Sequence, residues 1–260
     1  MFAEKPPAVS LERLEKTERL LSTRYRPKLM FGFNHRHKPS FLTLLEALRS
    51  DTLGELLWIR GRYGKELTTD FFNDWRSKMS LAGGGVLLDQ GIHLLDLIRL
   101  IAGPFDEYQS LVSSRSTNLP GIEDNAFALM RSSSSGVEAS IHSTMTQWRY
   151  LFALEVFCSE GSAVWNGLRT PSGNYGSESL TVRTRDGAEL ELEGFRRAID
   201  FGEDEWSHEA NLFARYVREQ DPFSVPDIRE AKATLDMVEK IYKADASFWQ
   251  ERKTALRESG

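Results

Sequence analysis

The spacing of apolar residues predicts a short α/β unit at the start of the chain. Over residues 10–25, leucines recur at helical spacing among charged residues, and the hydroxyl of Ser10 is placed to cap the first turn of a helix. Residues 29–33 form a short apolar run without helical polarity, which is typical of a buried strand. If residues 1–5 continue a strand, the opening order is strand, helix, strand.

The next part of the chain alternates between helical and extended patterns. Residues 39–50 are predicted to form a helix, and residues 55–63 a strand after a tight turn. Residues 70–81 are polar with embedded aromatic side chains, as expected of a loop that reaches a pocket. Three glycines at 83–85 then precede an apolar helix over residues 86–102, which a Gly-Pro pair ends.

From residue 106 to about residue 192 the pattern changes to short strands separated by turn residues. The predicted strands are 108–114, 126–131, 137–144, 151–158, 162–165, 179–184 and 189–192. Turn-forming sequences between them favour hairpins, so neighbouring strands are expected to be antiparallel. Two helices, 207–219 and 228–251, finish the chain. The prediction is an α+β fold: a large, mostly antiparallel sheet with helices on one face, preceded by a fragment of an α/β domain.

Composition and charge exclude several classes of function. The balance of 33 Lys and Arg against 38 Asp and Glu gives a net charge of -5, which disfavours a polyanion-binding surface, so we expect no nucleic-acid partner. The single cysteine, Cys158, lies in an apolar run and is expected to be a small buried hydrophobe. There is no signal-like N-terminus and no window near the length of a spanning helix. We therefore expect no membrane partner and a cytoplasmic location.

The most informative polar residues lie after the glycines. Asp89 and His93 are four apart, so on a helix they share a face, and their background is apolar. A carboxylate and an imidazole on one rigid surface suit proton transfer to or from an alcohol. The alternative is a helix-capping aspartate and a satisfied core histidine. Lys5 follows a presumptive strand end, where an open α/β sheet binds ligands, although a lysine near a terminus is usually solvated.

Other aromatic and imidazole side chains carry weaker signals. His35 and His37 suggest a metal site, but without nearby cysteine or carboxylate ligands they are better interpreted as a solvated turn, and no metal is predicted. His142 and His208 are given ordinary structural roles, with pocket lining as the alternative. The strand aromatics are expected to be core or subunit-contact residues: Trp148, Tyr150, Phe152 and Phe157.

Four short segments together resemble a known family. In order, they are Glu4-Lys5-Pro6-Pro7-Ala8, Gly32-Phe33-Asn34-His35-Arg36, Gly54-Glu55-Leu56 and the stretch from Gly84 to His93. Their order and spacing are similar to those of the Gfo/Idh/MocA oxidoreductases, named for glucose-fructose oxidoreductase and inositol dehydrogenase. The resemblance implies an enzyme that oxidises a secondary hydroxyl of a sugar, cyclitol or sugar nucleotide with NAD or NADP.

The resemblance also implies roles for individual residues around the reacting hydroxyl. Lys5 resembles the lysine that contacts this hydroxyl and the nicotinamide edge, within the cofactor-side segment Glu4, Lys5 and Pro6, where the peptide to Pro6 is often cis. Asp89 resembles the carboxylate that orients the substrate, and His93 the general base.

Three further residues are implied substrate contacts. Trp75 and Arg76 belong to a segment that resembles the substrate-side loop, where the indole offers an apolar face to a sugar ring and the guanidinium a forked donor. Arg36, in the second motif, is the third implied contact.

One departure from the family pattern is expected to matter. Family members begin with a Rossmann half that carries a glycine-rich turn, and no such element precedes Lys5. We therefore expect residues 1–36 to be a remnant of the dinucleotide-binding domain and residues 37–260 the substrate-binding and oligomerisation domain. NAD or NADP is expected to bind the intact parent and not to bind this chain tightly. The alternative is a truncated, non-catalytic ligand-binding or oligomerisation module; the sequence leaves open whether the chain is a fragment or a natural truncation.

A large sheet with helices on one face leaves its other face uncovered, which favours pairing with a second copy. We expect a homodimer or homotetramer formed through that face, as the resemblance also implies. Candidate contact residues on the strands are Phe127, Leu129, Leu151 and Phe152.

Overall fold

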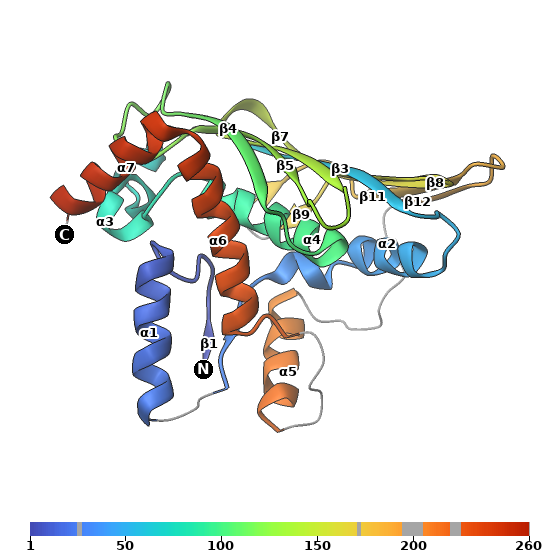
Figure 1. The fold of residues 1–260 in the computed structure, drawn as a ribbon, viewed down its shortest axis with the longest axis horizontal. Helices are drawn as coiled ribbons and strands as arrows, with labels where there is room; N and C mark the ends of the chain where they lie inside the picture. Colours follow the sequence, from blue (N-terminus) through green and yellow to red (C-terminus); the bar gives the residue numbers. More distant parts are fainter. Residues whose placement is uncertain (25–27, 171–172, 194–204, 219–224, 260) are drawn as a thin grey trace.

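The fold is built from one large sheet, a set of helices beneath it and a small parallel strand pair (Figure 1). A computed structural model describes residues 1–24, 28–170, 173–193, 205–218 and 225–259. The helices are α1 (Leu11–Arg24), α2 (Pro39–Arg49), α3 (Met79–Ala82), α4 (Ile92–Ala102), α5 (Glu205–Val217), α6 (Ile228–Ala244) and α7 (Ala246–Glu258). The strands are β1 (Phe2–Ala3), β2 (Met30–Phe31), β3 (Leu56–Glu66), β4 (Glu107–Ser113), β5 (Asn125–Arg131), β6 (Glu138–Thr144), β7 (Thr146–Cys158), β8 (Gly161–Asn166), β9 (Arg169–Thr170), β10 (Gly173–Asn174), β11 (Ser179–Thr184) and β12 (Glu189–Glu193).

The predicted opening order of strand, helix, strand is confirmed. β1 and β2 are parallel, with Phe2 opposite Met30. The amide of Arg13 donates to the Ser10 hydroxyl at 3.3 Å, so Ser10 caps α1 as expected. The proposed boundary after residue 36 falls inside a 3-10 turn, Asn34–His37, and stays a prediction.

The large sheet has eight strands in the order β12-β11-β8-β7-β3-β6-β5-β4. All its neighbouring pairs are antiparallel except β3 and β6, which are parallel. This confirms the predicted α+β class. The long strand β3 lies near the middle of the sheet, between β7 and β6, and alternate residues along it face the covered side.

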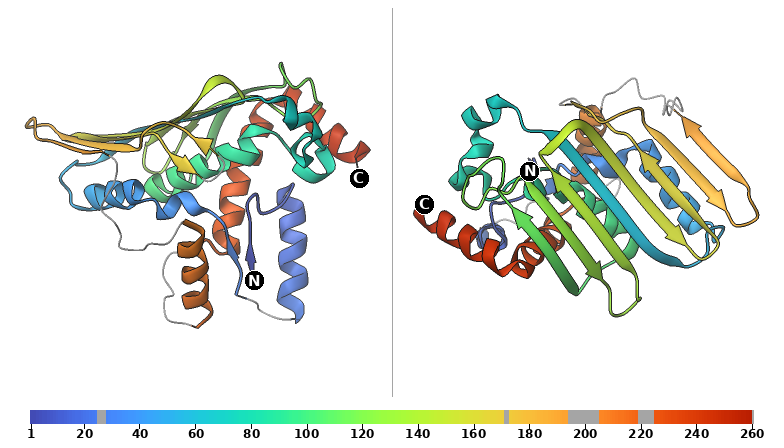
Figure 2. Two further views of the ribbon diagram at one scale, coloured as in Figure 1. Left: turned by 180° about the vertical axis from the view of Figure 1, so that it is seen from behind. Right: turned by 90° about the horizontal axis from the view of Figure 1, so that it is seen from above.

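Helices cover one face of this sheet, and no described helix lies over the other (Figure 2). Close approach of α4 to β3 depends on Gly61, where a Cβ would lie 3.1 Å from a methyl group of Leu94. On the open face Leu111 and Leu129 are more than half exposed. Phe152, predicted as a candidate contact, is instead 1% exposed, because alternation along β7 turns it towards the helices while Leu151 faces the other way.

Two predicted helices are each divided in two. Residues 86–102 form a π-helical turn, Leu87–Gly91, followed by α4. The helix predicted over 228–251 ends at Ala244, and α7 begins at Ala246. Asp245 causes this second break, because its carboxylate accepts from the amides of Phe248 at 3.1 Å and Val112 at 2.9 Å and so starts a new helix.

Two predictions about the environment of the chain can be compared with the structure. Cys158 is buried at 8% exposure, as expected of a small hydrophobe. Among the described residues, none of the helices combines the length and apolar character needed to cross a membrane.

Candidate active site

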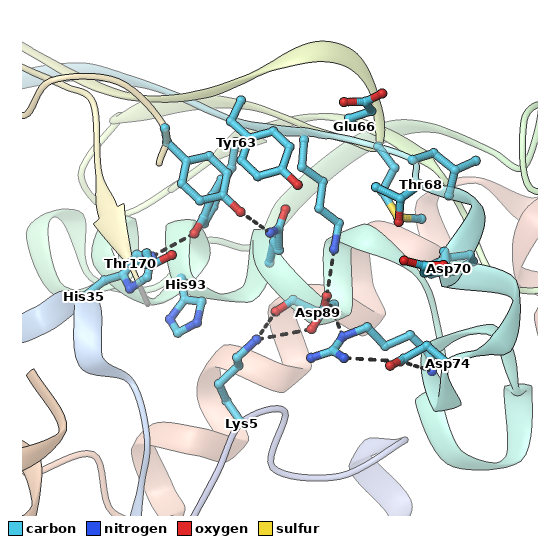
Figure 3. Close-up of a pocket in the computed structure, with 18 of the residues that line it drawn as sticks. Lys5, His35, Tyr63, Glu66, Thr68, Asp70, Asp74, Asp89, His93 and Thr170 are labelled. Carbon is cyan, nitrogen blue, oxygen red and sulfur yellow. Dashed lines mark hydrogen bonds and ion pairs between the residues drawn. The ribbon is translucent and has the colours of Figure 1, made fainter. Parts of the chain in front are cut away.

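A pocket of about 560 Å³ opens where the N-terminal segment meets the covered face of the sheet (Figure 3). The turn after β1, the C-terminal half of β3, the loop that follows it, the π-helical turn and part of β7 all line this pocket. Lys5, Asp89 and His93, which are up to 88 positions apart in sequence, all face it. The structure therefore brings the three predicted acid/base residues together.

Asp89 is held by three cationic side chains. The Lys5 ammonium donates to its Oδ1 at 3.2 Å and also to its backbone carbonyl, while Lys65 Nζ and Arg76 Nε each donate to Oδ2 at 3.2 Å. Burial raises the pKa of Asp89, but the charges of Lys5, Lys65 and Arg76 outweigh it and hold that pKa well below the usual range. Asp89 is thus ionised at neutral pH and binds the three cationic side chains around it. Its carboxylate contacts these side chains and does not cap a helix, which was the alternative interpretation.

His93 is buried beside Lys5 and Asp89. It is 5% exposed, and its Nδ1 has no hydrogen-bond partner among the described residues, so it is not a satisfied core histidine. Burial, followed by the charges of His35 and Lys5, holds the pKa of His93 well below 6.5. The ring is therefore neutral at pH 7 and able to accept a proton.

His35 is a pocket residue, so its interpretation as part of a solvated turn was wrong. It is 3% exposed, its Nδ1 donates to Asn34 Oδ1 at 2.8 Å, and its Nε2 lies 3.1 Å from the Tyr63 hydroxyl. Burial is the main cause that lowers its pKa well below 6.5. Its neighbour His37 contacts the ring of His208 at 5.1 Å. Within the described part of the chain, no group of side chains has the composition of a metal site.

Arg36 does not reach the pocket, contrary to the predicted substrate contact. Its Nε donates to Asp96 at 2.6 Å, and its Nη2 lies 3.2 Å from Glu230. Successive residues of a tight turn point in different directions, so His35 faces the pocket while Arg36 points towards α4 and α6. A guanidinium that is only 5% exposed needs carboxylate partners to offset the loss of hydration. Arg36 therefore has a structural role, because it links its own turn to α4 and α6.

The predicted substrate loop divides between two cavities. Arg76 lines the main pocket, where it contacts Asp89, and Asp74 holds it by an ion pair at 3.2 Å. Trp75 is 39% exposed, stacks on the Arg76 guanidinium at 4.5 Å, and lines a small neighbouring cavity together with Pro6.

The cofactor-side segment is also placed at the pocket. Glu4 and Lys5 line it, and the peptide between Lys5 and Pro6 is cis, as the resemblance implied. A Cβ at Gly32 would lie 2.8 Å from the Glu4 carboxylate, so the glycine of the second motif makes room for Glu4.

Three residues that carried weaker signals in the sequence can now be placed in the structure. Tyr150, expected in the core or at a subunit contact, lines the pocket and stacks on Tyr175 with ring centroids 4.9 Å apart. His142 lies away from the pocket, where it stacks on Phe127 at 3.9 Å and contacts Asn125 at 3.1 Å. Trp148 is 86% exposed and so is not a core residue.

Glu123, which sequence reasoning missed, positions the whole motif. Its fully buried carboxylate accepts from the amides of Gly85 at 2.6 Å and Leu87 at 2.8 Å, and from the Tyr242 hydroxyl at 2.8 Å. A Cβ at Gly85 would lie 1.8 Å from the Glu123 carbonyl, which explains the need for glycine there. Burial raises the pKa of Glu123 to about 7. Nothing in the local sequence around Glu123 marks it as a partner of a turn 36 residues earlier.

Lys65 and Tyr63 were missed as well, although a signal existed. Both lie on β3 two residues apart, and strand alternation places them on the same face, towards the pocket. An alternating strand with a lysine near its end therefore marks a pocket wall.

The residues present fit only part of a dinucleotide. Among the described residues no strand leads through a glycine-rich turn into a helix, which is the usual pyrophosphate cradle. After β1 the chain continues as Glu4-Lys5-Pro6-Pro7. The described residues therefore offer contacts for a substrate and for the reacting end of a dinucleotide only.

The GFO/IDH/MocA C-terminal domain matches residues 41–164. The myo-inositol 2-dehydrogenase of Thermotoga maritima is 26% identical over 220 residues, which cover 78% of this chain and 63% of that protein. The 1,5-anhydro-D-fructose reductase of Ensifer adhaerens is 27% identical over 193 residues, which cover 72% of this chain and 55% of that protein. The chain thus spans less than two thirds of the length of these curated relatives.

Solved structures share the fold. An aldose-aldose oxidoreductase from Caulobacter crescentus complexed with glycerol superposes with a TM-score of 0.78 at 20% identity, covering 95% of this chain and 70% of that one. An inositol dehydrogenase homolog from Azotobacter vinelandii complexed with NAD+ gives 0.77 at 19% identity, covering 94% and 70%. Residues 41–164 thus match the C-terminal domain of the Gfo/Idh/MocA oxidoreductases, and the order of the motifs in the rest of the chain agrees with that match.

Proposed function

We propose that the protein carrying this chain oxidises a secondary hydroxyl of a sugar, cyclitol or sugar nucleotide, with NAD or NADP as the hydride acceptor. One observation carries the proposal: a lysine, a permanent carboxylate and a neutral imidazole face one pocket. Names of relatives support the substrate class, because levoglucosan, anhydrofructose and myo-inositol are all polyhydroxylated rings.

The three residues divide the chemistry at the alcohol. The Lys5 ammonium donates a hydrogen bond to the reacting oxygen and stabilises the negative charge that develops as the proton leaves. His93 takes that proton, which a neutral ring is able to do. Asp89 holds Lys5 and Arg76 in place and orients the substrate. A bound nicotinamide supplies the hydride acceptor.

The pocket walls suit a ring with hydroxyl groups. Tyr63, Tyr150 and Tyr175 supply aromatic surface on one side, while charged groups from the loop after β3 line the other. Aromatic surface contacts the C–H faces of a sugar, and the polar groups bind its hydroxyls. We keep Glu4, Lys5 and Pro6 as the proposed cofactor side and Trp75 and Arg76 as the proposed substrate side.

The test uses a fusion of this chain with a nucleotide-binding domain from a relative. The corresponding N-terminal segment of the Thermotoga maritima myo-inositol 2-dehydrogenase is fused ahead of Met1, and reduction of NAD or NADP is followed by absorbance with inositols, aldoses and levoglucosan. We expect turnover with at least one compound, and its loss in the fusion with Lys5→Met.

The alternative, a ligand-binding module without redox chemistry, gives a different outcome. A fusion that binds both a nicotinamide cofactor and a sugar but reduces no cofactor with any compound contradicts the proposal and favours that module. The matched control is Lys16→Met, because it removes an exposed lysine charge outside the pocket.

A further inference from the structure

Gln90 is a buried pocket residue with one half of its amide unused. It lies between Asp89 and His93 on the π-helical turn, is 9% exposed and lines the pocket. Its Nε2 donates to the Tyr175 hydroxyl at 2.7 Å. Its Oε1 is buried and has no hydrogen-bond partner among the described residues. Buried amide oxygens are nearly always paired, so an unpaired one at a pocket wall points to a ligand.

A row of polar side chains, His35, Tyr63 and Tyr175, lines the same pocket as Gln90. Because His35 Nδ1 donates to Asn34, the neutral ring has its lone pair on Nε2, which accepts from the Tyr63 hydroxyl. Each hydroxyl has only one proton to give.

Gln90 Nε2 donates to the oxygen of Tyr175, whose ring lies 5.0 Å from that of Tyr63. This contact uses the donor end of the amide, so its oxygen, an acceptor, is the end left unpaired among the described residues.

We propose that Gln90 is a specificity-determining residue whose Oε1 accepts a hydrogen bond from a second hydroxyl of the substrate ring, beside the hydroxyl that reacts at Lys5 and His93. The inference rests on the proposed function for the position of the reacting hydroxyl. Gln90 and His93 are one helical turn apart, so their side chains are neighbours along the pocket wall. The substrate class is thereby narrowed to polyols with two neighbouring hydroxyls.

The consequence is discrimination against deoxy compounds. A substrate that lacks the second hydroxyl leaves Oε1 buried and unpaired, and such a loss weakens binding by about 10- to 100-fold. Because Oε1 accepts and does not donate, a ring carbonyl or ether at that position is rejected as well.

Equilibrium binding tests the proposal without a cofactor or turnover. Myo-inositol, D-glucose and levoglucosan, together with their monodeoxy analogues, are titrated by calorimetry and ligand-observed NMR into the 260-residue chain and into Gln90→Met, which keeps the length of the side chain and removes the acceptor. We expect at least one parent compound to bind the unmodified chain about 10-fold or more tightly than the variant. One monodeoxy analogue should then bind both proteins equally.

Two controls separate recognition from misfolding. Tyr175→Phe removes the group that orients the amide and keeps the acceptor, so it should weaken binding less than Gln90→Met. In the unmodified chain, the Gln90 side-chain amide resonances should shift on titration with the parent compound and stay in place with its analogue.

Equal dissociation constants for the unmodified chain and Gln90→Met across the panel, including no binding to either, overturn the proposal. The result is independent of the redox test. A fusion without dehydrogenase activity refutes the proposed function, whereas unchanged selectivity in Gln90→Met refutes only the role of Gln90.

Discussion

The imidazole rings of His35 and His93 lie face to face, with centroids 3.9 Å apart and an interplanar angle of 7°. Burial is the main cause that lowers the pKa of both rings; the charge of His35 and then that of Lys5 lower the pKa of His93 further, and the charges of Lys38 and then Lys5 lower that of His35. Two stacked cations beside a third would repel in a buried site, so both rings are neutral at pH 7. Neutrality is the property that a proton acceptor needs.

Replacement of the proposed base should affect turnover more than binding. In the cofactor-binding fusion, His93→Ala is expected to lower kcat by about 10²- to 10⁴-fold at neutral pH, because a positioned base contributes that much to rate. Steady-state kinetics measure the effect. Asp89→Asn should change both kcat and KM, since it alters orientation as well as charge. Unchanged kcat in His93→Ala returns this histidine to a structural role.

Removal of the Lys5 charge should raise the pKa of His93. After burial and His35, the Lys5 ammonium also lowers the pKa of His93, so Lys5→Met is expected to move that pKa towards 6.5. The Cε1 proton resonance of His93, followed by NMR from pH 4 to 8, reports the change. Lys65→Met is the matched control, because Lys65 also binds Asp89, whereas the charges that lower the His93 pKa are those of His35 and Lys5. Equal shifts in both variants contradict this account.

Glu123 should make stability depend on pH in an unusual direction. Its pKa is raised from 4.5 to about 7 in the folded protein, so between these values the folded state keeps a proton that the unfolded chain has released. The free energy of unfolding should therefore fall with rising pH in this window, by at most about 1.4 kcal/mol per pH unit from this group.

The test compares Glu123→Gln with the unmodified chain by urea denaturation from pH 4.5 to 7.5. The stability difference should shift in favour of the variant as pH rises, because glutamine does not ionise. Histidine titrations cancel in this difference. Glu55→Gln, at an exposed position, should track the unmodified chain at every pH.

The chain by itself should bind neither NAD nor NADP appreciably. The described residues include no pyrophosphate cradle, and Glu4 and Lys5 are proposed to contact only the reacting end of a dinucleotide. Calorimetric titration of the 260-residue chain checks this, and micromolar affinity for either nucleotide refutes it. The fusion with an N-terminal nucleotide-binding half should recover binding.

The open face of the sheet should pair with a second copy. Leu111, Phe127 and Leu129 are 73%, 49% and 59% exposed and lie on the paired strands β4 and β5, so they form one apolar patch. We expect a homodimer or a higher even-numbered oligomer by light scattering at tens of micromolar protein. A folded monomer near 29.6 kDa contradicts the expectation. Leu129→Glu should weaken the assembly, whereas Leu20→Glu, exposed on α1, should leave it intact.

Local patterns in the sequence were sufficient for the elements and for part of the site. Alternation predicted most strands, and helical spacing predicted the helices. Asp89 and His93 stood out because polar residues in apolar surroundings are costly unless they have a role, whereas Lys5 was singled out by its place after an expected strand. Ser10 was identified as a cap because capping depends on neighbours within one turn.

Contacts between distant residues were decided only by the tertiary structure. Arg36 lies outside the predicted site because it pairs with Asp96 and Glu230, which are 60 and 194 positions away in the sequence. His35 lies in the site because a tight turn places its ring against that of His93. The sequence by itself determined most of the helices and strands, since apolar periodicity is local, but not the break at Asp245, which also binds the distant amide of Val112. The tertiary structure determined which buried charges meet, since a carboxylate or guanidinium is satisfied by whichever partner the packing of distant elements brings within reach.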